Sequence, residues 1–188
     1  VRYHGGSVDP YMASSQAWVM RLQGAAWGDD GTGYAVLQNT YHGEDRAYLH
    51  ELTGASFEPG DGMTIQELTS LTYDGHFGWL VASTGLGDYI DLGTSVFRFE
   101  AGEWTPLELP AELAEGVASS GCGAGPDRAW VHAYTDDSTD LTHWVYEDGT
   151  WSAVATGLPW PEVGPGAVCR ADGTAWGVTP YQGGARYF

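Results

Sequence analysis

The sequence predicts an all-β protein built from about four repeats of a small antiparallel sheet. Aromatic residues recur at a nearly constant spacing, because Tyr34, Trp79, Trp130 and Trp176 are separated by 45, 51 and 46 residues (79−34, 130−79, 176−130). The 28 glycines and the 13% share of aromatic residues are typical of short strands that are joined by tight turns. Regular spacing and turn-rich composition together indicate a repeated β-sheet unit.

The clearest single unit is a β-hairpin over residues 142–154. Two aromatic-rich runs flank the pair Asp148-Gly149, and an Asp-Gly pair between such runs is the sequence signal of a tight hairpin turn. The same pattern stands at 95–107 and, more weakly, at 47–57. Its aromatic markers Phe57, Trp104 and Trp151 are each 47 residues apart (104−57, 151−104), so the hairpin repeats with the same period.

The repeats divide the chain into a leader at 1–14, a strand at 15–22, and four units at about 23–60, 61–110, 111–160 and 161–188. Four-stranded units of about 47 residues have the period expected for the blades of a β-propeller. The last unit stops at its third strand, near Ala185 to Phe188, whereas the segment around Trp18 resembles a fourth strand that lacks the other three. We therefore predict that residues 15–22 pair with the last unit and close the ring, which would remove two exposed sheet edges.

The hairpins also resemble degenerate versions of the Asp-box of sialidase-type propellers, Ser-x-Asp-x-Gly-x-Thr-Trp. Residues Asp148-Gly149-Thr150-Trp151 match the end of that box, without one spacer residue and the leading serine. The chain thus resembles the β-propeller superfamily and no specific family within it. An all-β sandwich with chance similarity among its hairpins is the alternative. Four blades make a small ring, so the chain could also belong to a larger propeller or be completed by a second copy in a homodimer.

Charge and composition exclude several classes of partner. The chain has 25 acidic and seven basic residues, all of them arginine, for a net charge of −18. Phosphate backbones and anionic membranes would be repelled, so nucleic-acid binding is not expected. No apolar run approaches the roughly 18 residues of a membrane span. An acidic, lysine-free domain with two cysteines predicts a secreted, periplasmic or cell-surface protein.

The longest loops of a propeller of this kind would emerge together on one face. They combine acidic and aromatic residues, a mixture that suits sugars or a cationic patch on a partner protein. We predict that this face binds a protein or glycan partner, with ordinary solvated surface as the alternative. The predicted ligand-binding residues are Tyr41, Glu44, Asp45, Asp88, Tyr89, Asp91 and Trp160.

One of these loops offers candidate metal ligands. Asp136, Asp137 and Asp140 supply oxygen atoms of the kind that Ca²⁺ prefers, although no EF-hand spacing accompanies them and a solvated loop is the alternative. His132 and His143 flank the same loop on neighbouring strands and are predicted to face each other. Such a pair can bind zinc or copper or can be structural, and no cysteine or carboxylate completes a recognisable metal site.

The two cysteines occupy nearly equivalent places in adjacent repeats. Cys122 lies 8 residues before Trp130 and Cys169 lies 7 residues before Trp176 (130−122, 176−169). A disulfide requires Cα atoms within about 7 Å of each other, and equivalent inner-strand positions of neighbouring blades are expected to be somewhat farther apart. A disulfide and two buried thiols therefore both remain open.

The sequence holds no motif that names a reaction. A glycosidase needs two carboxylates about 5 to 10 Å apart, a condition that some pair among 25 acidic residues meets by chance. Nucleophile-elbow, zinc-protease and dinucleotide-binding motifs are absent. We therefore predict a non-catalytic binding module. A carbohydrate-binding lectin, a polysaccharide-active enzyme and a structural accessory subunit are the alternatives.

Overall fold

The computed structural model describes residues 2–4, 7–9, 20–39, 46–53, 56–65, 67–84, 93–134, 140–159, 167–169, 175–181 and 184–187. They form an all-β, propeller-like fold in which each of the larger sheets runs up and down in sequence order, with antiparallel neighbours throughout. The predicted fold class is confirmed at this level.

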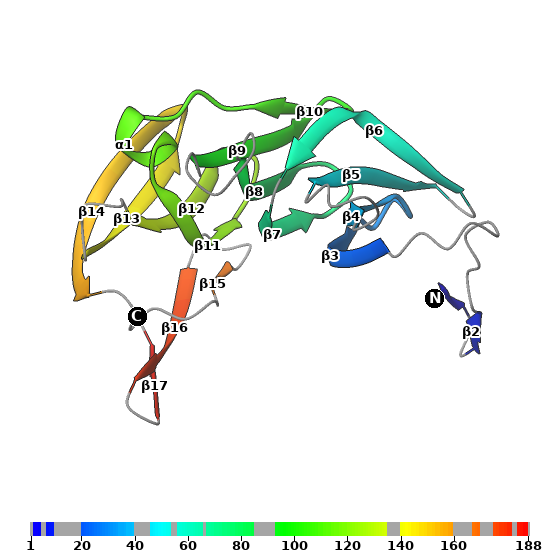
Figure 1. Cartoon of the computed structure of the whole chain (residues 1–188). Coiled ribbons are helices and arrows are strands. Elements are labelled where there is room, and N and C mark those ends of the chain that lie inside the picture. Colours follow the sequence, from blue (N-terminus) through cyan, green and yellow to red (C-terminus); the bar gives the residue numbers. More distant parts are fainter. Residues whose placement is uncertain are drawn as a thin grey trace.

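Four sheets, here called blades 1 to 4, follow one another along the chain (Figure 1). Blade 1 consists of β3 (Met20–Trp27), β4 (Gly33–Asn39), β5 (Arg46–Thr53) and β6 (Ser56–Ile65). Blade 2 consists of β7 (Glu67–Tyr73), β8 (Gly78–Thr84), β9 (Gly93–Glu100) and β10 (Glu103–Pro106).

The helix α1 (Ala111–Ala114) leads into blade 3, which consists of β11 (Val117–Gly123), β12 (Arg128–Tyr134), β13 (Asp140–Glu147) and β14 (Thr150–Pro159). Blade 4 has three described strands, β15 (Ala167–Cys169), β16 (Ala175–Tyr181) and β17 (Gly184–Tyr187). The first strands of successive blades contact each other, β3 with β7, β7 with β11 and β11 with β15, as the inner strands of a propeller do.

The interfaces between blades 1 and 2 and between blades 2 and 3 are apolar cores, because alternate residues of a strand point to opposite faces of its sheet. On β8, Trp79 and Val81 pack toward blade 3, whereas Leu80 and Ala82 pack toward blade 1. We call the side of a blade that meets the next blade its forward side and the opposite side its rear side. Blade 2 thus packs against blade 3 with its forward side and against blade 1 with its rear side.

The aromatic repeat serves these interfaces. Tyr34 of blade 1 packs against Phe99 and Trp104 of blade 2, with ring centroids 5.5 and 5.3 Å apart. One blade later, Trp79 packs against Tyr146 at 5.4 Å, and Tyr146 in turn packs against Trp151 at 5.1 Å. The recurring aromatics thus join the second strand of one blade to the outer hairpin of the next.

The predicted tight hairpin turns are confirmed. Ala101 and Gly102 have φ values of 55° and 91°, and Asp148 and Gly149 have values of 48° and 83°. Positive φ at both central residues defines the type I′ turn, whose twist matches that of the flanking strands. The two turns sit at equivalent places in blades 2 and 3, which shows that the sequence repeat is also a structural one.

The chain ends differ in part from expectation. Met20, Arg21 and Leu22, which we expected in the closing strand, instead pair with Asn39, Gln38 and Leu37 of β4. The inner strand of blade 1 therefore begins earlier than predicted, and residues 15–19 with Trp18 lie outside the described residues. Among the described strands, β16 is the neighbour of β17, so closure of the ring stays a prediction.

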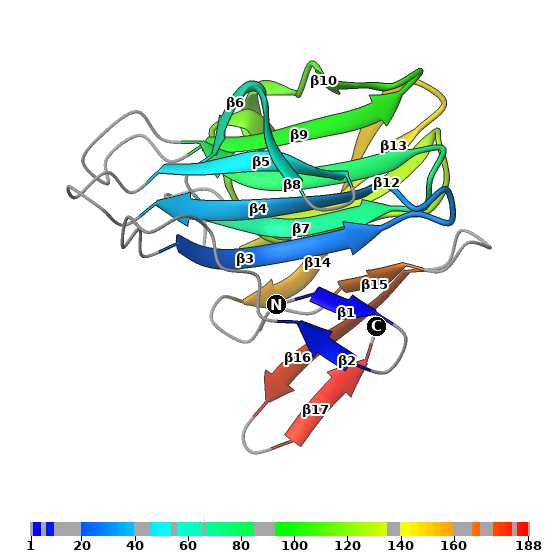
Figure 2. The same ribbon diagram turned by 90° about the vertical axis from the view of Figure 1, so that its right-hand side faces the viewer.

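Two further boundaries also differ. Blade 1 extends to Ile65, past the predicted boundary at residue 60, because β6 continues until Ile65 lies opposite Ala47 in the core. The predicted leader contains a small hairpin, β1 (Arg2–His4) paired with β2 (Ser7–Asp9). Figure 2 shows this hairpin and the end of the chain on the same side of the four-stranded blades.

Candidate functional site

The predicted binding face is built on the ends of three equivalent strand pairs. β4 with β5, β8 with β9 and β12 with β13 open toward the segments 40–45, 85–92 and 135–139. Because β4, β8 and β12 are all second strands of blades that pack in succession, these three openings lie on one face, which we call the loop face (Figure 2). The tight turns 101–102 and 148–149 lie at the opposite ends of the strands, on what we call the turn face.

Most of the sequence-predicted site residues lie outside the described part of the chain: Tyr41, Glu44, Asp45, Asp88, Tyr89, Asp91, Asp136, Asp137 and Trp160. Asp140 is the first residue of β13, where its backbone is opposite Pro159. Their roles in binding a partner or Ca²⁺ therefore remain predictions. Among the side chains that the structure describes, no group of three or more His, Cys, Asp or Glu residues is placed to hold a metal ion.

The base of the loop face is fixed by hydrogen bonds between blades. The Gln23 side-chain oxygen accepts the backbone N–H of Leu68 at 2.8 Å, joining β3 to β7. The Thr94 hydroxyl donates to the Gly116 carbonyl at 2.8 Å, joining β9 to the segment that enters blade 3. Thr94 is 4% exposed. Bonds of this kind hold neighbouring strand ends at fixed distances, so the loop face has a rigid floor.

A row of polar side chains crosses blade 3 just below this face. Ser120, His132 and His143 lie opposite one another on β11, β12 and β13. Ser120 Oγ is 2.7 Å from His132 Nδ1, and His132 Nε2 is 2.7 Å from His143 Nδ1. The predicted pairing of the two histidines is thus confirmed.

The histidine row replaces apolar residues of the repeat. In blades 1 and 2 the equivalent cross-strand pairs are Val36 with Leu49 and Val81 with Val96, and all four side chains belong to the forward cores. Blade 3 has His132 with His143 at this register. The forward side of blade 3 therefore carries two titratable groups where blades 1 and 2 carry aliphatic ones.

Burial keeps both histidines neutral near pH 7. Loss of hydration lowers the pKa of His132 to about 4, and the neighbouring His143 contributes in the same direction. Burial likewise lowers the pKa of His143 below its usual value. Two neutral imidazoles can share one proton between Nε2 and Nδ1, and the Ser120 hydroxyl can act as donor or acceptor as the tautomer requires. The row is a hydrogen-bonded chain at neutral pH.

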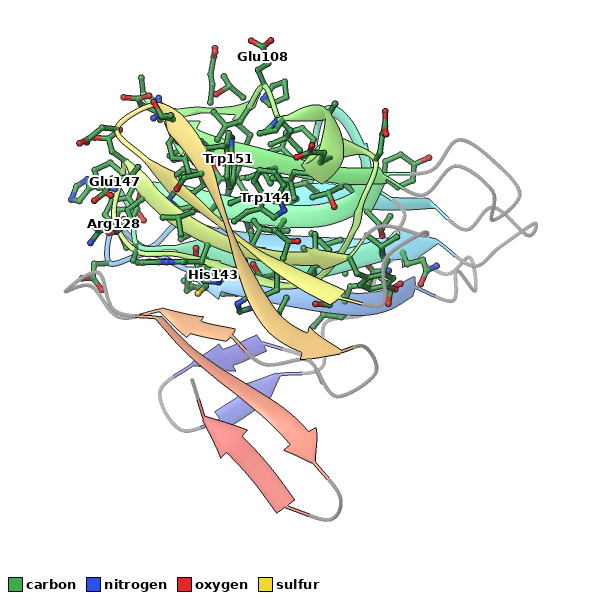
Figure 3. The ribbon with its side chains drawn as sticks, turned by 90° about the vertical axis from the view of Figure 1, so that its left-hand side faces the viewer. Glu108, Arg128, His143, Trp144, Glu147 and Trp151 are labelled. Carbon is green, nitrogen blue, oxygen red and sulfur yellow. The ribbon has the colours of Figure 1, made fainter. Side chains whose placement is uncertain are left out.

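The turn face carries ion pairs that sequence reasoning missed. Arg98 contacts Glu100 and, at 3.1 Å, Asp127 of the next blade, while Arg128 contacts Glu147 within blade 3 (Figure 3). Opposite charges at facing positions of neighbouring strands are the signal that could have predicted the Arg128 pair. The Arg98 to Asp127 contact depends on how two blades pack, which no local pattern reports.

Cys122 takes part in a disulfide bond. The sequence has one other cysteine, Cys169, and its strand β15 packs beside β11. The one-residue offset between the cysteines has a structural meaning, since Cys122 is opposite Trp130 whereas Cys169 is opposite Ala175, one residue before Trp176. Cys122 therefore takes a forward register position and Cys169 a rear one, so the two positions belong to the same interface.

We expect the intact protein to contain no reactive thiol. Under denaturing, non-reducing conditions a thiol reagent should label neither cysteine, and reduction should raise the intact mass by two hydrogen atoms and expose two labelled sites. A Cys169→Ser variant should then label at Cys122 without reduction. Labelling of both cysteines in the unreduced protein would contradict the pairing.

Comparisons with known proteins bear on the fold alone. No family model and no curated protein matches the chain. Among solved structures, the chain is similar to one from a structural and mechanistic study of two prolyl endopeptidases, with 15% sequence identity and a TM-score of 0.52. The match covers 91% of this chain and 28% of that one, so this chain spans little more than a quarter of its length.

Fold and site together define the class of protein. Successive antiparallel sheets, inner strands in contact and apolar cores between neighbours make it an all-β protein with a propeller-like fold. In the described residues no helix has the length and apolar character that crossing a bilayer requires.

Proposed function

We propose that the protein is a non-catalytic binding module that holds a glycan or protein partner on its loop face. One observation carries the proposal: three equivalent strand pairs end on one face, where hydrogen bonds join neighbouring blades. Rigid scaffolds that gather long connections on one side are the usual way in which β-proteins present binding residues. The turn face, by contrast, is closed by two-residue turns.

The chemistry of the ligand follows from the predicted site residues in segments 40–45 and 85–92, together with Trp160 in the connection that follows β14. Tyr41, Tyr89 and Trp160 offer flat apolar faces, and Glu44, Asp45, Asp88 and Asp91 offer hydrogen-bond acceptors. This combination suits the ring faces and hydroxyl groups of a sugar. The net charge of −18 also favours a partner with a cationic surface.

An extracytoplasmic location is part of the proposal. The disulfide at Cys122 supports it, because disulfides persist in oxidising compartments and are rare in the cytosol. The absence of lysine and the acidic composition are in keeping with this setting.

Glycan-array binding with matched variants tests the function. We expect saturable binding of at least one class of glycan, weakened about tenfold or more in Trp160→Ala and in Tyr89→Ala, since stacking on an aromatic ring contributes a large part of sugar affinity. Glu103→Gln on the turn face, where Glu103 is exposed, is the control and should bind as the parent does.

The other outcomes separate the alternatives. Release of a shortened product from a bound glycan would show an enzyme and overturn the non-catalytic assignment. Silence across the array, with capture of a cationic protein that Trp160→Ala abolishes, would keep the loop face and replace the sugar by a protein partner. If Glu103→Gln weakened binding as much as Trp160→Ala does, the assignment of the binding site to the loop face would be wrong.

A further inference from the structure

The inner strand of blade 1 exposes two large apolar side chains. Leu22 is 59% exposed and Trp27 is 60% exposed, and these are the exposed large hydrophobic residues among the side chains that the structure describes. Both lie on β3, which is followed by well-packed strands. Apolar residues with this exposure on an inner strand indicate a surface that packs against another element.

The repeat identifies what kind of neighbour this is. Ala26 is opposite Tyr34 on β4, and Thr72 is opposite Trp79 on β8, so β3 and β7 align with an offset of 46 residues (72−26). Leu22 and Trp27 are therefore equivalent to Leu68 and Tyr73 of β7.

Those two equivalents are packed against the preceding blade. Leu68 packs against the core between blades 1 and 2, and Tyr73 is a buried member of it. The Tyr73 hydroxyl also donates to Asp30 Oδ2 of blade 1 at 3.0 Å. In β7, these positions pack blade 2 against the blade before it. Leu22 and Trp27 hold the same positions in blade 1, whose rear side has no neighbour among the described residues.

Other rear positions of blade 1 continue the apolar surface. Leu37 and Leu52 are equivalent to Ala82 and Phe99, which are both buried in the core between blades 1 and 2. Leu37 and Leu52 are only partly buried. The rear side of blade 1, defined by Leu22, Trp27, Leu37 and Leu52, thus has the composition of an interface between blades.

The surface that would fit it is the forward side of a blade, and blade 4 supplies the matching register. Trp176 and Val178 on β16 stand at the positions of Trp79 and Val81 on β8, and Tyr187 is opposite Val178 as Val96 is opposite Val81. In blade 2 these positions form the forward core. Figure 1 shows blade 1 and blade 4 at opposite ends of the arc of sheets.

We propose that a second copy of this chain covers the rear side of blade 1, with its blade 4 as the occupant. The contact is head to tail, because it joins two different surfaces of the same chain, and a twofold arrangement uses both surfaces of both copies. It extends the blade-to-blade packing that already joins blade 1 to blade 2. Two copies with a net charge of −18 each repel one another, so added salt strengthens the association by screening that repulsion.

Sedimentation analysis of the full chain over two orders of magnitude in concentration tests this. We expect a monomer–dimer equilibrium that shifts toward dimer as salt is raised. Trp27→Glu should weaken dimerisation at least about tenfold, since a carboxylate would be buried against apolar groups. Ala153→Asp, an exposed position on β14, is the matched control and should dimerise as the parent does. Unchanged far-ultraviolet circular dichroism of dilute Trp27→Glu would show that the blade itself is intact.

A mixing experiment distinguishes a head-to-tail contact from a contact between two identical surfaces. Trp27→Glu removes the rear surface of blade 1, and Val178→Asp removes the forward surface of blade 4. Each variant alone should be monomeric, and an equimolar mixture should recover a one-to-one complex, since each partner retains one intact surface. A monomer at every concentration, a dimer that Trp27→Glu leaves unchanged, or a mixture that does not associate would each overturn the proposal.

Discussion

Replacing Trp79 by alanine is expected to cost about 3 to 5 kcal/mol of unfolding free energy, the range for removing a buried indole from a packed core. Trp79 is 0% exposed and lies at the centre of the core between blades 2 and 3. Its Nε1–H donates to the Gly125 carbonyl at 2.7 Å. Because whole domains are typically stable by about 5 to 15 kcal/mol, the loss should appear as a large drop in the urea midpoint.

Two matched variants show whether the packing or the hydrogen bond is responsible. Trp79→Phe keeps an aromatic ring and loses the bond to Gly125, so it should cost clearly less than Trp79→Ala. Gly123→Ala tests the same packing by adding an atom, since a Cβ there would lie 1.9 Å from Trp79 Cδ1. It should destabilise the fold by crowding. Equal stability of Trp79→Ala and Trp79→Phe would contradict the central place of this ring.

Acidification from pH 7 to pH 4 is expected to remove about 3 kcal/mol of stability through His132. Its pKa is lowered to about 4 in the folded chain, against about 6.5 for an exposed histidine. The unfolded state therefore binds the proton first as pH falls. Stability from this group is complete above about pH 6.5, declines between about 6.5 and 4, and does not fall further below that window. His143 acts in the same direction, because burial lowers its pKa as well.

The double variant His132→Val/His143→Val is the matched control, because Val81 and Val96 occupy the same positions in blade 2. The 25 acidic residues also titrate near pH 4, so the measured quantity is the difference in unfolding free energy between parent and double variant at each pH. We expect the parent to lose stability relative to the double variant steadily from pH 7 to pH 4. A difference that stays constant with pH would show that the histidine pair is not the acid-sensitive element.

The unpaired hydroxyl of Ser70 indicates that the control should fold. Ser70 lies opposite Val81 on the inner strand of blade 2, as Ser120 lies opposite His132 in blade 3. Ser70 Oγ is buried without a hydrogen-bond partner in the structure. Leaving Ser120 Oγ beside a valine would therefore reproduce a situation that the chain already tolerates in its neighbouring blade.

Local patterns were sufficient for the features that depend on one strand pair. Asp148-Gly149 predicted a tight hairpin turn, and the turn is of type I′, because only a few residue pairs accept positive φ at both central positions. The facing of His132 and His143 followed from their places on either side of one loop, on strands predicted to be neighbours. The site residues assigned to the loop face are a different case, since they lie in connections whose conformation no period constrains.

The sequence alone determined the repeat, the all-β class, the aromatic second strands and the hairpin turns, because each of these depends on alternation and turn chemistry within a few residues of the chain. Only the tertiary structure decided that Gly123 leaves room for Trp79, that Ser120 joins the histidine row, that Arg98 reaches Asp127 and that blade 1 leaves Leu22 and Trp27 uncovered. These outcomes depend on how sheets pack across distances of about 10 Å between segments that are far apart along the chain, and a spacing of residues carries no information about which neighbour fills that space.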